Sequence, residues 1–266
     1  MFKLGPNSIG FEVKKRVFGQ QDRGISPKGA NDQTSFITAL ALLGNPKQCT
    51  CFEIFFAQEI TFTENIMFTL TGAHYHKTTL NEQDVHHACV YEAKKGDVLR
   101  LKKRTKGFRV YLMACDVNST RIGKTAKPYS HYFPQPSPLI RVTKAPEFDY
   151  LREDFFKYAY KISSTSDMSG LRLEQKVKAK SYDIITSAVT DGTVQLTKDG
   201  PIVLLRQRQS TGGYPRTLNV IESDIDRLAQ YPYGAYIRFK LISMKMSIEL
   251  LLEHEKTLLN IQDDLA

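Results

Sequence analysis

The sequence predicts a mainly β protein with a few short helices and one longer C-terminal helix. Most apolar segments are short, rich in Val, Ile, Phe and Tyr, and bounded by Gly, Pro, Asn or Asp, as strands between turns are. Only four segments space their apolar residues as a helix does. The 266 residues are 41% hydrophobic and 11% aromatic, which excludes a disordered chain. Many short strands separated by turns are typical of barrels and sandwiches.

The expected strands follow from these short apolar runs. They are Phe11–Phe18, Thr50–Ala57, Ile66–Thr71, Asp97–Lys102, Phe108–Cys115, Tyr160–Ser164, Ile184–Val189, Pro201–Arg206, Thr217–Ile221 and Ala235–Ile242.

The clearest helix is expected from about Asp32 to Leu43. Asn31 or Asp32 can accept the free N–H groups of its first turn, and Gly44 ends it.

Three further helices are expected later in the chain. One follows Pro146, a short one starts at Ser223, and the last spans about Met244 to Asp264. We expect the apolar stripe of the last helix to pack on the protein's own core rather than on a partner. The stripe consists of Ile248, Leu251, Leu252, Leu258 and Leu259.

A proline-rich segment divides the chain into two β-rich halves. Its prolines are Pro128, Pro134, Pro136, Pro138 and Pro146. Because proline cannot donate to a sheet ladder, we interpret this segment as a loop or linker. The expected organisation is an N-terminal half at 1–127, a linker at 128–146 and a C-terminal half at 147–266.

The chain is basic, with 37 Lys+Arg against 28 Asp+Glu and a formal charge of +9. The densest basic stretch is Lys94–Lys106, where Gly96-Asp97 is a turn signal and Val98 and Leu101 indicate a hairpin with basic exposed positions. Nucleic-acid readers usually add stacking aromatics or a recognisable module, and neither is present. Nucleic-acid binding is therefore disfavoured, although salt-sensitive affinity would reveal it.

Neither a membrane span nor a secretory signal is visible. A span needs roughly 18 nearly uncharged apolar residues, and no window supplies them. The cysteines Cys49, Cys51, Cys89 and Cys115 form no CxxC pair. We expect reduced thiols in a cytoplasmic protein.

Metal binding is a disfavoured alternative. His74 and His76 would share one face of a strand, with His86, His87 and Glu82 nearby in sequence. The sequence supplies no ligand set at fixed spacing, so no metal is predicted. The chain also has no G-x-S-x-G elbow, P-loop or G-x-G-x-x-G fingerprint.

Two segments of the second half carry more polar residues than strands need. In Ser166–Glu174, alternation would place Arg172 and Glu174 on one face. In Arg208–Pro215, Gly212-Gly213 frees the backbone to approach a ligand or to take φ > 0, and its N–H groups could hold an anion. The alternative for the second segment is a tight turn closed by Tyr214-Pro215.

These segments resemble motifs of a known family. Ser166–Glu174 resembles the S-D-x-x-G-x-R-L-E motif of the allophanate hydrolase subunit 2 family, which includes the C subunit of 5-oxoprolinase. Asp199–Pro215 resembles the D-G-x-P-I-x-L and R-Q-T-T-G-G-Y-P block of that family. Asp224–Gln230 resembles the family's D-L-x-x-L-A-Q motif, and these blocks of the second half are specific. Weaker matches in the first half keep the family's order: Gly29–Asp32, Leu43–Pro46, Phe52–Ile54, Thr71–Ala73 and Arg109–Leu112.

The resemblance implies a fold and a function. The fold would be two cyclophilin-like β-barrel halves. The function would be that of a C-type subunit of an ATP-dependent 5-oxoprolinase, which hydrolyses the lactam 5-oxoproline to L-glutamate. ATP would bind in the complex. The implied partners are a B-type 5-oxoprolinase subunit and, as a further candidate, an A-type one.

The resemblance also implies site residues. Asp167 and Glu174 would orient an arginine or act as base, with Arg172 supplying charge; a salt bridge between Asp167 and Arg172 that braces a turn is the alternative. The substrate- and anion-binding set would be Arg208, Thr211, Gly212, Gly213, Tyr214, Gln195 and Asp32.

Departures from the family pattern keep other functions open. Lys15 departs from the family's Q-D-x-G-R pattern near the start, and Met168 stands where the S-D-R-M-G motif has its arginine. Gln207 occupies the acidic or amide position before the R-Q-T-T-G-G block, and a loop that the family has after the strand ending at Cys115 is missing. One alternative is a catalytically impaired interaction or regulatory protein. Another is a carboxyltransferase-type component of a biotin-dependent urea or amide carboxylase, the only interpretation that needs biotin.

Overall fold

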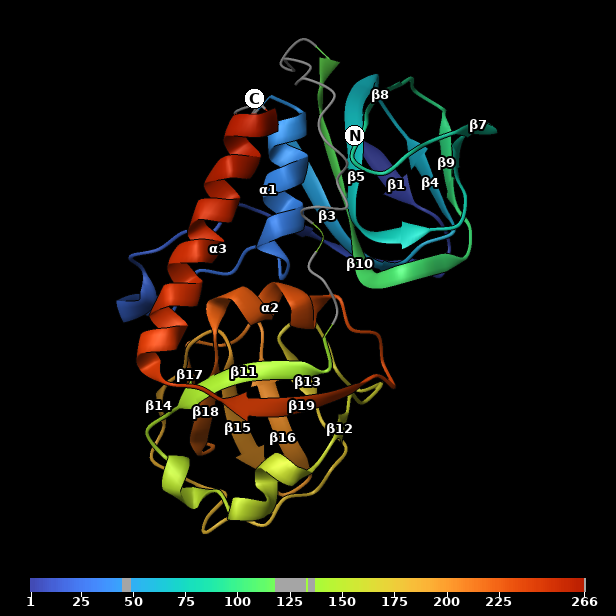
Figure 1. Cartoon of the computed structure of the whole chain (residues 1–266). Helices are drawn as coiled ribbons and strands as arrows, with labels where there is room; N and C mark the ends of the chain where they lie inside the picture. Colours follow the sequence, from blue (N-terminus) through green and yellow to red (C-terminus); the bar gives the residue numbers. More distant parts are fainter. Residues whose placement is uncertain (45–48, 118–132, 134–136, 266) are drawn as a thin grey trace. The chain divides into compact units, whose positions relative to one another are not determined.

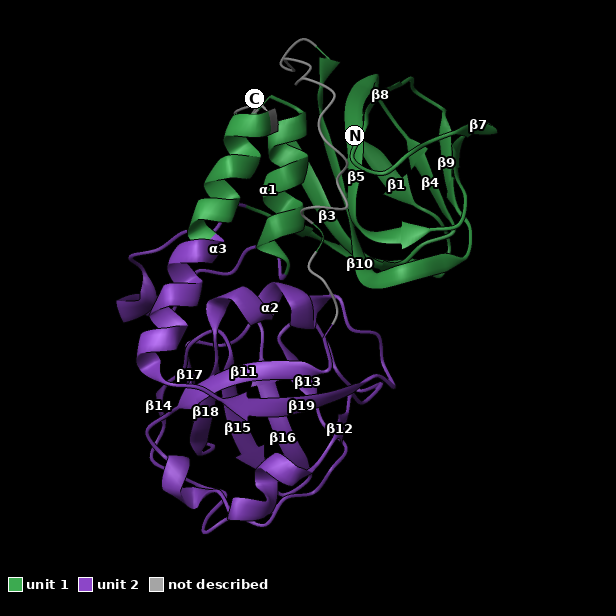
Figure 2. Cartoon of the chain, in the orientation of Figure 1, with its two compact units in different colours: residues 1–14, 32–134, 255–266 green, residues 15–31, 135–254 purple. Residues whose placement is uncertain are grey.

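The computed structural model describes residues 1–44, 49–117, 133 and 137–265, and the chain divides into two compact units (Figures 1 and 2). Unit 1 comprises Met1–Lys14, Asp32–Pro134 and Glu255–Ala266. Unit 2 comprises Lys15–Asn31 and Gln135–His254. The early segment Lys15–Asn31 therefore belongs to the unit formed by the second half of the sequence.

Unit 1 contains two five-stranded sheets and helix α1 (Gln33–Leu42). One sheet has the order β1-β4-β9-β6-β7 and the other β2-β3-β10-β5-β8. The strands are β1 (Phe2–Leu4), β2 (Ile9–Val13), β3 (Cys49–Phe56), β4 (Glu59–Phe62), β5 (Ile66–Tyr75), β6 (Thr78–Leu80), β7 (Gln83–Asp84), β8 (Val90–Ala93), β9 (Val98–Leu101) and β10 (Arg104–Asp116). Both sheets contribute side chains to one core, such as Ile60 and Leu99 from the first and Phe68 and Leu112 from the second.

Unit 2 is built on a seven-stranded sheet of order β12-β19-β11-β18-β15-β16-β13, with a separate β14-β17 pair. Its strands are β11 (Leu139–Lys144), β12 (Tyr160–Lys161), β13 (Gly170–Arg172), β14 (Ser187–Ala188), β15 (Thr193–Thr197), β16 (Gly200–Leu204), β17 (Thr211–Gly212), β18 (Arg216–Val220) and β19 (Tyr236–Leu241). Its helical segments are η1 (Gln21–Arg23), η4 (Phe148–Tyr150), η5 (Glu153–Lys157) and α2 (Glu222–Ala229). Helix α3 (Met244–Leu265) belongs to unit 2 up to His254 and to unit 1 from Glu255.

The mainly β class with a C-terminal helix is confirmed. In the seven-stranded sheet of unit 2, an isolated antiparallel bridge between Ile162 and Leu173 and the backbone hydrogen bonds beside it link the ends of the two edge strands, β12 and β13. No such bridge is found among the described residues of the two unit 1 sheets, so the closed barrel implied by the family resemblance is not formed there by strand pairing. In unit 1, two open sheets instead share one core, which buries their apolar faces without ring closure.

Three of the four expected helices form close to their predicted bounds. Helix α1 begins after Asp32, whose side chain accepts a hydrogen bond from the N–H of Ser35, and Gly44 has a φ of 76° just past its end. The expected helix after Pro146 is wrong, because the chain forms the 3₁₀ segments η4 and η5 instead. No helix among the described residues is long and apolar enough to cross a membrane.

The apolar stripe of α3 does not pack as expected. Ile248, Leu252 and Leu259 are 51–60% exposed. Only the last part of the stripe joins a core, where Leu258 and the fully buried Ile261 pack with residues of α1.

The proline-rich segment contains a strand that the sequence prediction lacked. β11 lies between β18 and β19 in the sheet and pairs in parallel with β19. Residues 118–132 and 134–136, which include the position of the missing family loop, lie outside the described residues.

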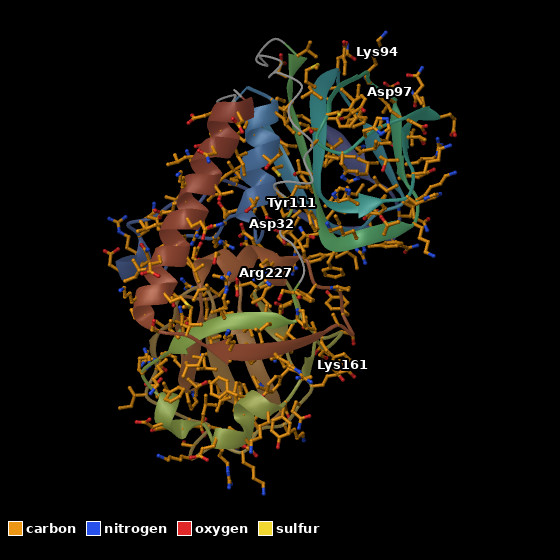
Figure 3. All side chains as sticks on the ribbon, viewed as in Figure 1. Asp32, Lys94, Asp97, Tyr111, Lys161 and Arg227 are labelled. Carbon is orange, nitrogen blue, oxygen red and sulfur yellow. The ribbon has the colours of Figure 1, made fainter. Side chains whose placement is uncertain are left out.

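The basic stretch Lys94–Lys106 contains the expected turn but not the expected hairpin. Asp97 accepts a hydrogen bond from the N–H of Lys94, and both lie at one turn (Figure 3). β8 before this turn pairs with β5, whereas β9 after it pairs with β4 and β6. The turn therefore carries the chain from one sheet to the other. The backbone N–H of Phe62 donates a hydrogen bond to the carbonyl of Asp97. Pairing of β9 with β4 therefore begins inside the turn, which prevents β9 from pairing with β8.

The four cysteines form no disulfide. Cys51 and Cys115 are buried, and Cys115 faces Cys49 across the β3–β10 pair.

Candidate functional site

Three neighbouring strands of unit 2 bring two predicted site residues onto one sheet face. Arg172 on β13 lies opposite Ile202 on β16, and Ile202 lies opposite Gln195 on β15. Because residues paired across antiparallel strands share a face, Arg172 and Gln195 point to the same side, with backbones about 10 Å apart. The residues next to these three in sequence point to the other face of the sheet, where they are part of the hydrophobic core: Leu171, Val194 and Val203.

The glycine-rich segment packs directly on Gln195. A Cβ on Gly212 would lie 2.6 Å from Gln195 Nε2, and Gln195 is only 1% exposed. Gln195 Nε2 also donates to the carbonyl of Tyr214, at 3.5 Å. Neither Gly212 nor Gly213 has a positive φ, so that part of the expectation is wrong. The close approach that requires glycine is made to the Gln195 amide.

Gly212→Ala is expected to lower the free energy of unfolding by about 1–3 kcal/mol, because the new methyl group would displace a buried amide. Gly213→Ala is the matched control. Its Cβ would meet Ile184 O at 3.7 Å, an ordinary contact. Urea denaturation of both variants measures the difference, and equal losses would contradict the packing described.

The predicted acidic residues are used locally. One oxygen of Asp167 accepts hydrogen bonds from Ser169 N at 2.7 Å, Ser169 Oγ at 2.6 Å and Gly170 N at 3.2 Å. Glu174 pairs with Lys161 at 3.0 Å, and both side chains are more than 40% exposed. No ion pair joins Asp167 to Arg172, so the alternative of a bracing salt bridge is wrong. Within the described chain, the exposed Arg172 guanidinium has no ion pair.

Arg208 is buried and its charge is balanced. Its Nε donates to Asp191 at 2.7 Å, and Arg16 binds the other oxygen of the same carboxylate. The positive charge expected from Arg208 is therefore neutralised inside the protein. Thr211, by contrast, lies exposed on β17, directly before Gly212.

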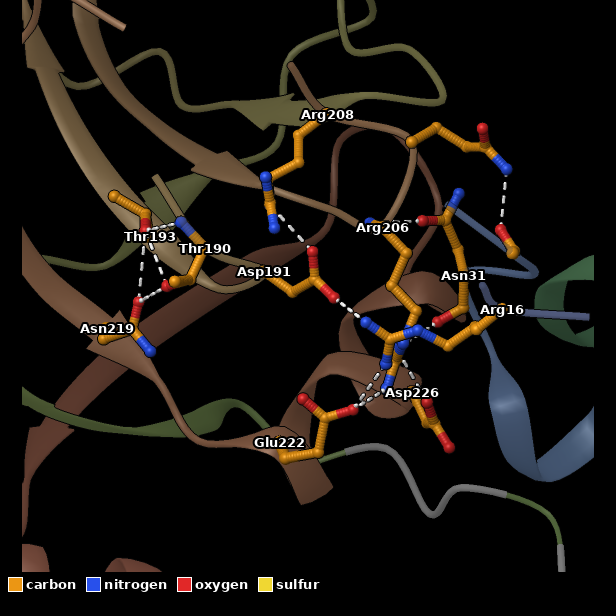
Figure 4. Close-up of polar contacts among 12 residues, drawn as sticks. Arg16, Asn31, Thr190, Asp191, Thr193, Arg206, Arg208, Asn219, Glu222 and Asp226 are labelled. Atoms are coloured by element: carbon orange, nitrogen blue, oxygen red, sulfur yellow. Dashed lines mark hydrogen bonds and ion pairs between the residues drawn. The ribbon is translucent and has the colours of Figure 1, made fainter. Parts of the chain in front are cut away.

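Arg206 is the centre of a buried ionic cluster that the sequence interpretation missed (Figure 4). It is fully buried, with Glu222 Oε1 2.6 Å from its Nη2 and Asp226 Oδ1 2.9 Å from its Nη1. Its backbone N–H donates to Asn31 Oδ1 at 2.9 Å. The whole cluster opposes three arginines to three carboxylates: Arg16, Arg206, Arg208, Asp191, Glu222 and Asp226.

The pKa directions agree with this charge balance. Burial alone would raise the pKa of Glu222, but Arg206 and Arg16 hold it below its usual value. Burial alone would lower the pKa of Arg206, but Glu222 and Asp226 hold it raised. The charged forms of Glu222 and Arg206 are thus favoured. The cluster fastens Lys15–Asn31 within unit 2 through Arg16 and Asn31.

Asp32, the remaining predicted binding residue, lies in unit 1. Its carboxylate accepts from Ser35 N at 2.9 Å and Ser35 Oγ at 2.6 Å, and its backbone N–H donates to Tyr111 (Figure 3). Tyr111 donates to Glu53 at 2.9 Å, and Glu53 pairs with the buried Arg109. Asp32 is fully buried as the helix cap.

The histidines of unit 1 stack on one another. The rings of His74 and His87 are nearly parallel, with centroids 4.8 Å apart. Burial lowers the pKa of His87 to about 3, so its ring is neutral. The described residues contain no group of three or more His, Cys, Asp or Glu side chains that could hold a metal ion.

Comparison with known proteins gives relatives of similar length. The C subunit of 5-oxoprolinase from Haemophilus influenzae is 26% identical over 278 residues, covering 90% of each chain. The C subunit of 5-oxoprolinase from Escherichia coli is 28% identical over 272 residues, covering 87% of each chain.

Solved structures share the fold. The urea amidolyase and the urea carboxylase of Kluyveromyces lactis superpose with TM-scores of 0.80 and 0.82 at 19% and 20% identity. All of this chain is covered, but it corresponds to only 20% and 29% of those longer chains.

The family resemblance is carried by nearly the whole chain. Residues 23–118 and 114–241 match the family described as carboxyltransferase domain, subdomain A and B. Together with the two 5-oxoprolinase relatives, this match confirms the resemblance stated from the sequence motifs. The chain belongs to the carboxyltransferase domain family, subdomains A and B.

Proposed function

We propose that this chain is the C-type subunit of a cytoplasmic, ATP-dependent 5-oxoprolinase that acts with a B-type partner subunit. The observation that carries the proposal is the likeness to two 5-oxoprolinase C subunits, which extends over 87–90% of this chain and of each relative. An A-type subunit would complete the complex. The reaction would open the lactam ring of 5-oxoproline to give L-glutamate.

The sheet face of unit 2 supplies groups suited to that substrate. 5-Oxoproline carries a carboxylate and a ring carbonyl, and negative charge develops on the carbonyl oxygen as the ring opens. Arg172, exposed and without an ion pair among the described residues, would bind the carboxylate or the developing oxyanion. The exposed Thr211 hydroxyl would donate a second hydrogen bond. Tyr214, 43% exposed, would form a wall of the site.

Most of the other predicted residues would hold the binding groups in place, and one would accept a proton. Asp167 would hold the turn that leads into β13 and so orient Arg172. Glu174, exposed beside Lys161, would be the proton acceptor. Gln195 and Gly212 would fix the segment that carries Thr211. ATP, when bound to the complex, would supply the activation of the ring carbonyl by phosphoryl transfer.

Reconstitution of the complex tests this proposal. The chain would be co-expressed with B-type and A-type 5-oxoprolinase subunits, purified as an assembly, and assayed for glutamate formed from 5-oxoproline and ATP. Co-purification with turnover is the expected result. Failure to associate with either protein would contradict it.

A regulatory role is the second candidate. Met168, 40% exposed, stands where the family motif has an arginine, and the Arg208 charge is neutralised by Asp191. These features would leave the fold and its partner surface intact while weakening catalysis. Stable association without glutamate formation would favour this role. Turnover of urea or another amide that requires a biotinylated protein would favour the carboxyltransferase alternative.

A further inference from the structure

A cavity of about 770 Å³ lies in unit 1 and is distinct from the sheet face of unit 2. Three strand connections meet around it: Gly5–Asn7 between β1 and β2, Phe56–Glu59 between β3 and β4, and Leu101–Arg104 between β9 and β10. The volume is within the range of roughly 300–1,000 Å³ in which small ligands and cofactors bind.

The cavity wall has a surplus of positive charge. Four basic side chains line it, Arg100, Lys102, Lys103 and Arg104, with Glu59 as the only acidic one among its described lining residues. Glu59 is already paired, because Arg100 Nε lies 2.8 Å from its carboxylate. Lys102 and Lys103 are exposed, and neither forms an ion pair within the described chain. The unbalanced charge is therefore at the β9–β10 connection.

Arg104 is a positioned cation rather than a mobile one. Its Nη1 donates to the carbonyls of Phe55 at 2.9 Å and Phe108 at 2.7 Å, and its guanidinium stacks over the Phe108 ring at 4.8 Å. No carboxylate pairs with it within the part of the chain that the structure describes. Tyr75 lies opposite Arg104 across the β5–β10 pair and also lines the cavity.

An aromatic ring completes the wall. Phe56, at the end of β3, is 45% exposed although it lies beside the buried Ala57 and Leu101. An exposed phenyl face beside three unneutralised cations suits a ligand with a planar ring and several negative charges. Phosphate oxygens match lysine and arginine donors, and any base can stack on an aromatic ring.

We propose that this cavity binds a nucleotide, with the base against Phe56 and the phosphates at Lys102, Lys103 and Arg104. The site gives a role to the basic stretch Lys94–Lys106 that the proposed sheet-face site does not use. The compact volume fits a mononucleotide better than an extended strand. Identifying this nucleotide with the ATP of the reaction rests on the proposed function, whereas the binding site itself does not.

Calorimetric titration of the 266-residue chain with ATP tests the site. The K102A/K103A variant should bind ATP at least about tenfold more weakly, because each lysine–phosphate contact is a charge-assisted hydrogen bond. K94A/K95A is the matched control, since it removes the same charge from the same stretch at exposed positions outside the cavity. It should bind ATP as the wild type does. F56A should weaken ATP binding but leave the binding of inorganic tripolyphosphate unchanged.

Several outcomes would overturn the site. They are no saturable binding of ATP, equal losses in the two double-lysine variants, or tighter binding of a single-stranded oligonucleotide than of ATP. The result is also separable from the proposed function. ATP binding without 5-oxoproline turnover by the assembled complex would refute the function alone. Turnover with an unchanged KM for ATP in K102A/K103A would refute the link between this site and the reaction's ATP.

Discussion

Replacing Arg206 by methionine is expected to lower the free energy of unfolding by about 3–5 kcal/mol, because it removes the ion pair of the buried Asp226 carboxylate with Arg206. Arg206 is fully buried, and it pairs with Glu222 at 2.6 Å and Asp226 at 2.9 Å. Urea denaturation measures the loss. Lys161→Met is the control, because its pair with Glu174 is exposed and should contribute about 0–1 kcal/mol.

A second variant and the pH dependence separate charge from packing. R206M/D226L should lose less stability than R206M, since it also removes the buried Asp226 carboxylate whose ion pair with Arg206 is lost. The folded-state pKa of Glu222 is lowered from 4.5, so its contribution is complete above pH 4.5 and is lost as the pH falls through the lower folded value. R206M should weaken this acid dependence. Equal stability losses in R206M and K161M would contradict the assigned role of the cluster.

Replacing Arg172 by alanine is expected to reduce kcat/KM for 5-oxoproline by roughly 100-fold in the assembled complex, the effect of removing one donor to a developing charge. The stability of the chain should stay nearly constant, because the side chain is exposed and forms no ion pair among the described residues. Steady-state kinetics and urea denaturation of the same variant test both parts.

Arg238→Ala provides the matched control for Arg172. Arg238 is an exposed arginine of the same sheet, but its strand β19 pairs with β11 and β12 and not with β13. R238A should retain full turnover. The sheet-face site is refuted if R172A keeps wild-type turnover or if R238A loses as much.

The fold was predictable where local signals agree with tertiary packing. Asp32 and Gly44 mark the ends of α1 because capping is decided within one helical turn. The apolar run of β10 is long enough to identify a central strand from sequence alone. β11 was missed because flanking prolines mask a strand whose neighbours, β18 and β19, lie far along the chain. The 3₁₀ segments η4 and η5 were assigned as one α-helix because their apolar spacing resembles a helical stripe.

The candidate site was predictable only in part. Alternation correctly separates Arg172 from the core residue Leu171, and Gly212 was identified as a position of close backbone approach. The partner of Gly212 is Gln195, which only strand pairing brings near. Arg206 was missed because its partners Asn31, Glu222 and Asp226 are distant in sequence. The available signal was a charged residue directly after the buried run Val203–Leu205.

Omission of this chain from the reconstituted complex tests the central claim most directly. ATP hydrolysis and glutamate formation from 5-oxoproline would be followed with the B-type and A-type 5-oxoprolinase subunits present, with and without the chain. The proposed function predicts that glutamate and ADP form in equal amounts only when the chain is present. Glutamate formation at the same rate without it, or stable assembly with no glutamate formed, would contradict the assignment as a working C-type subunit.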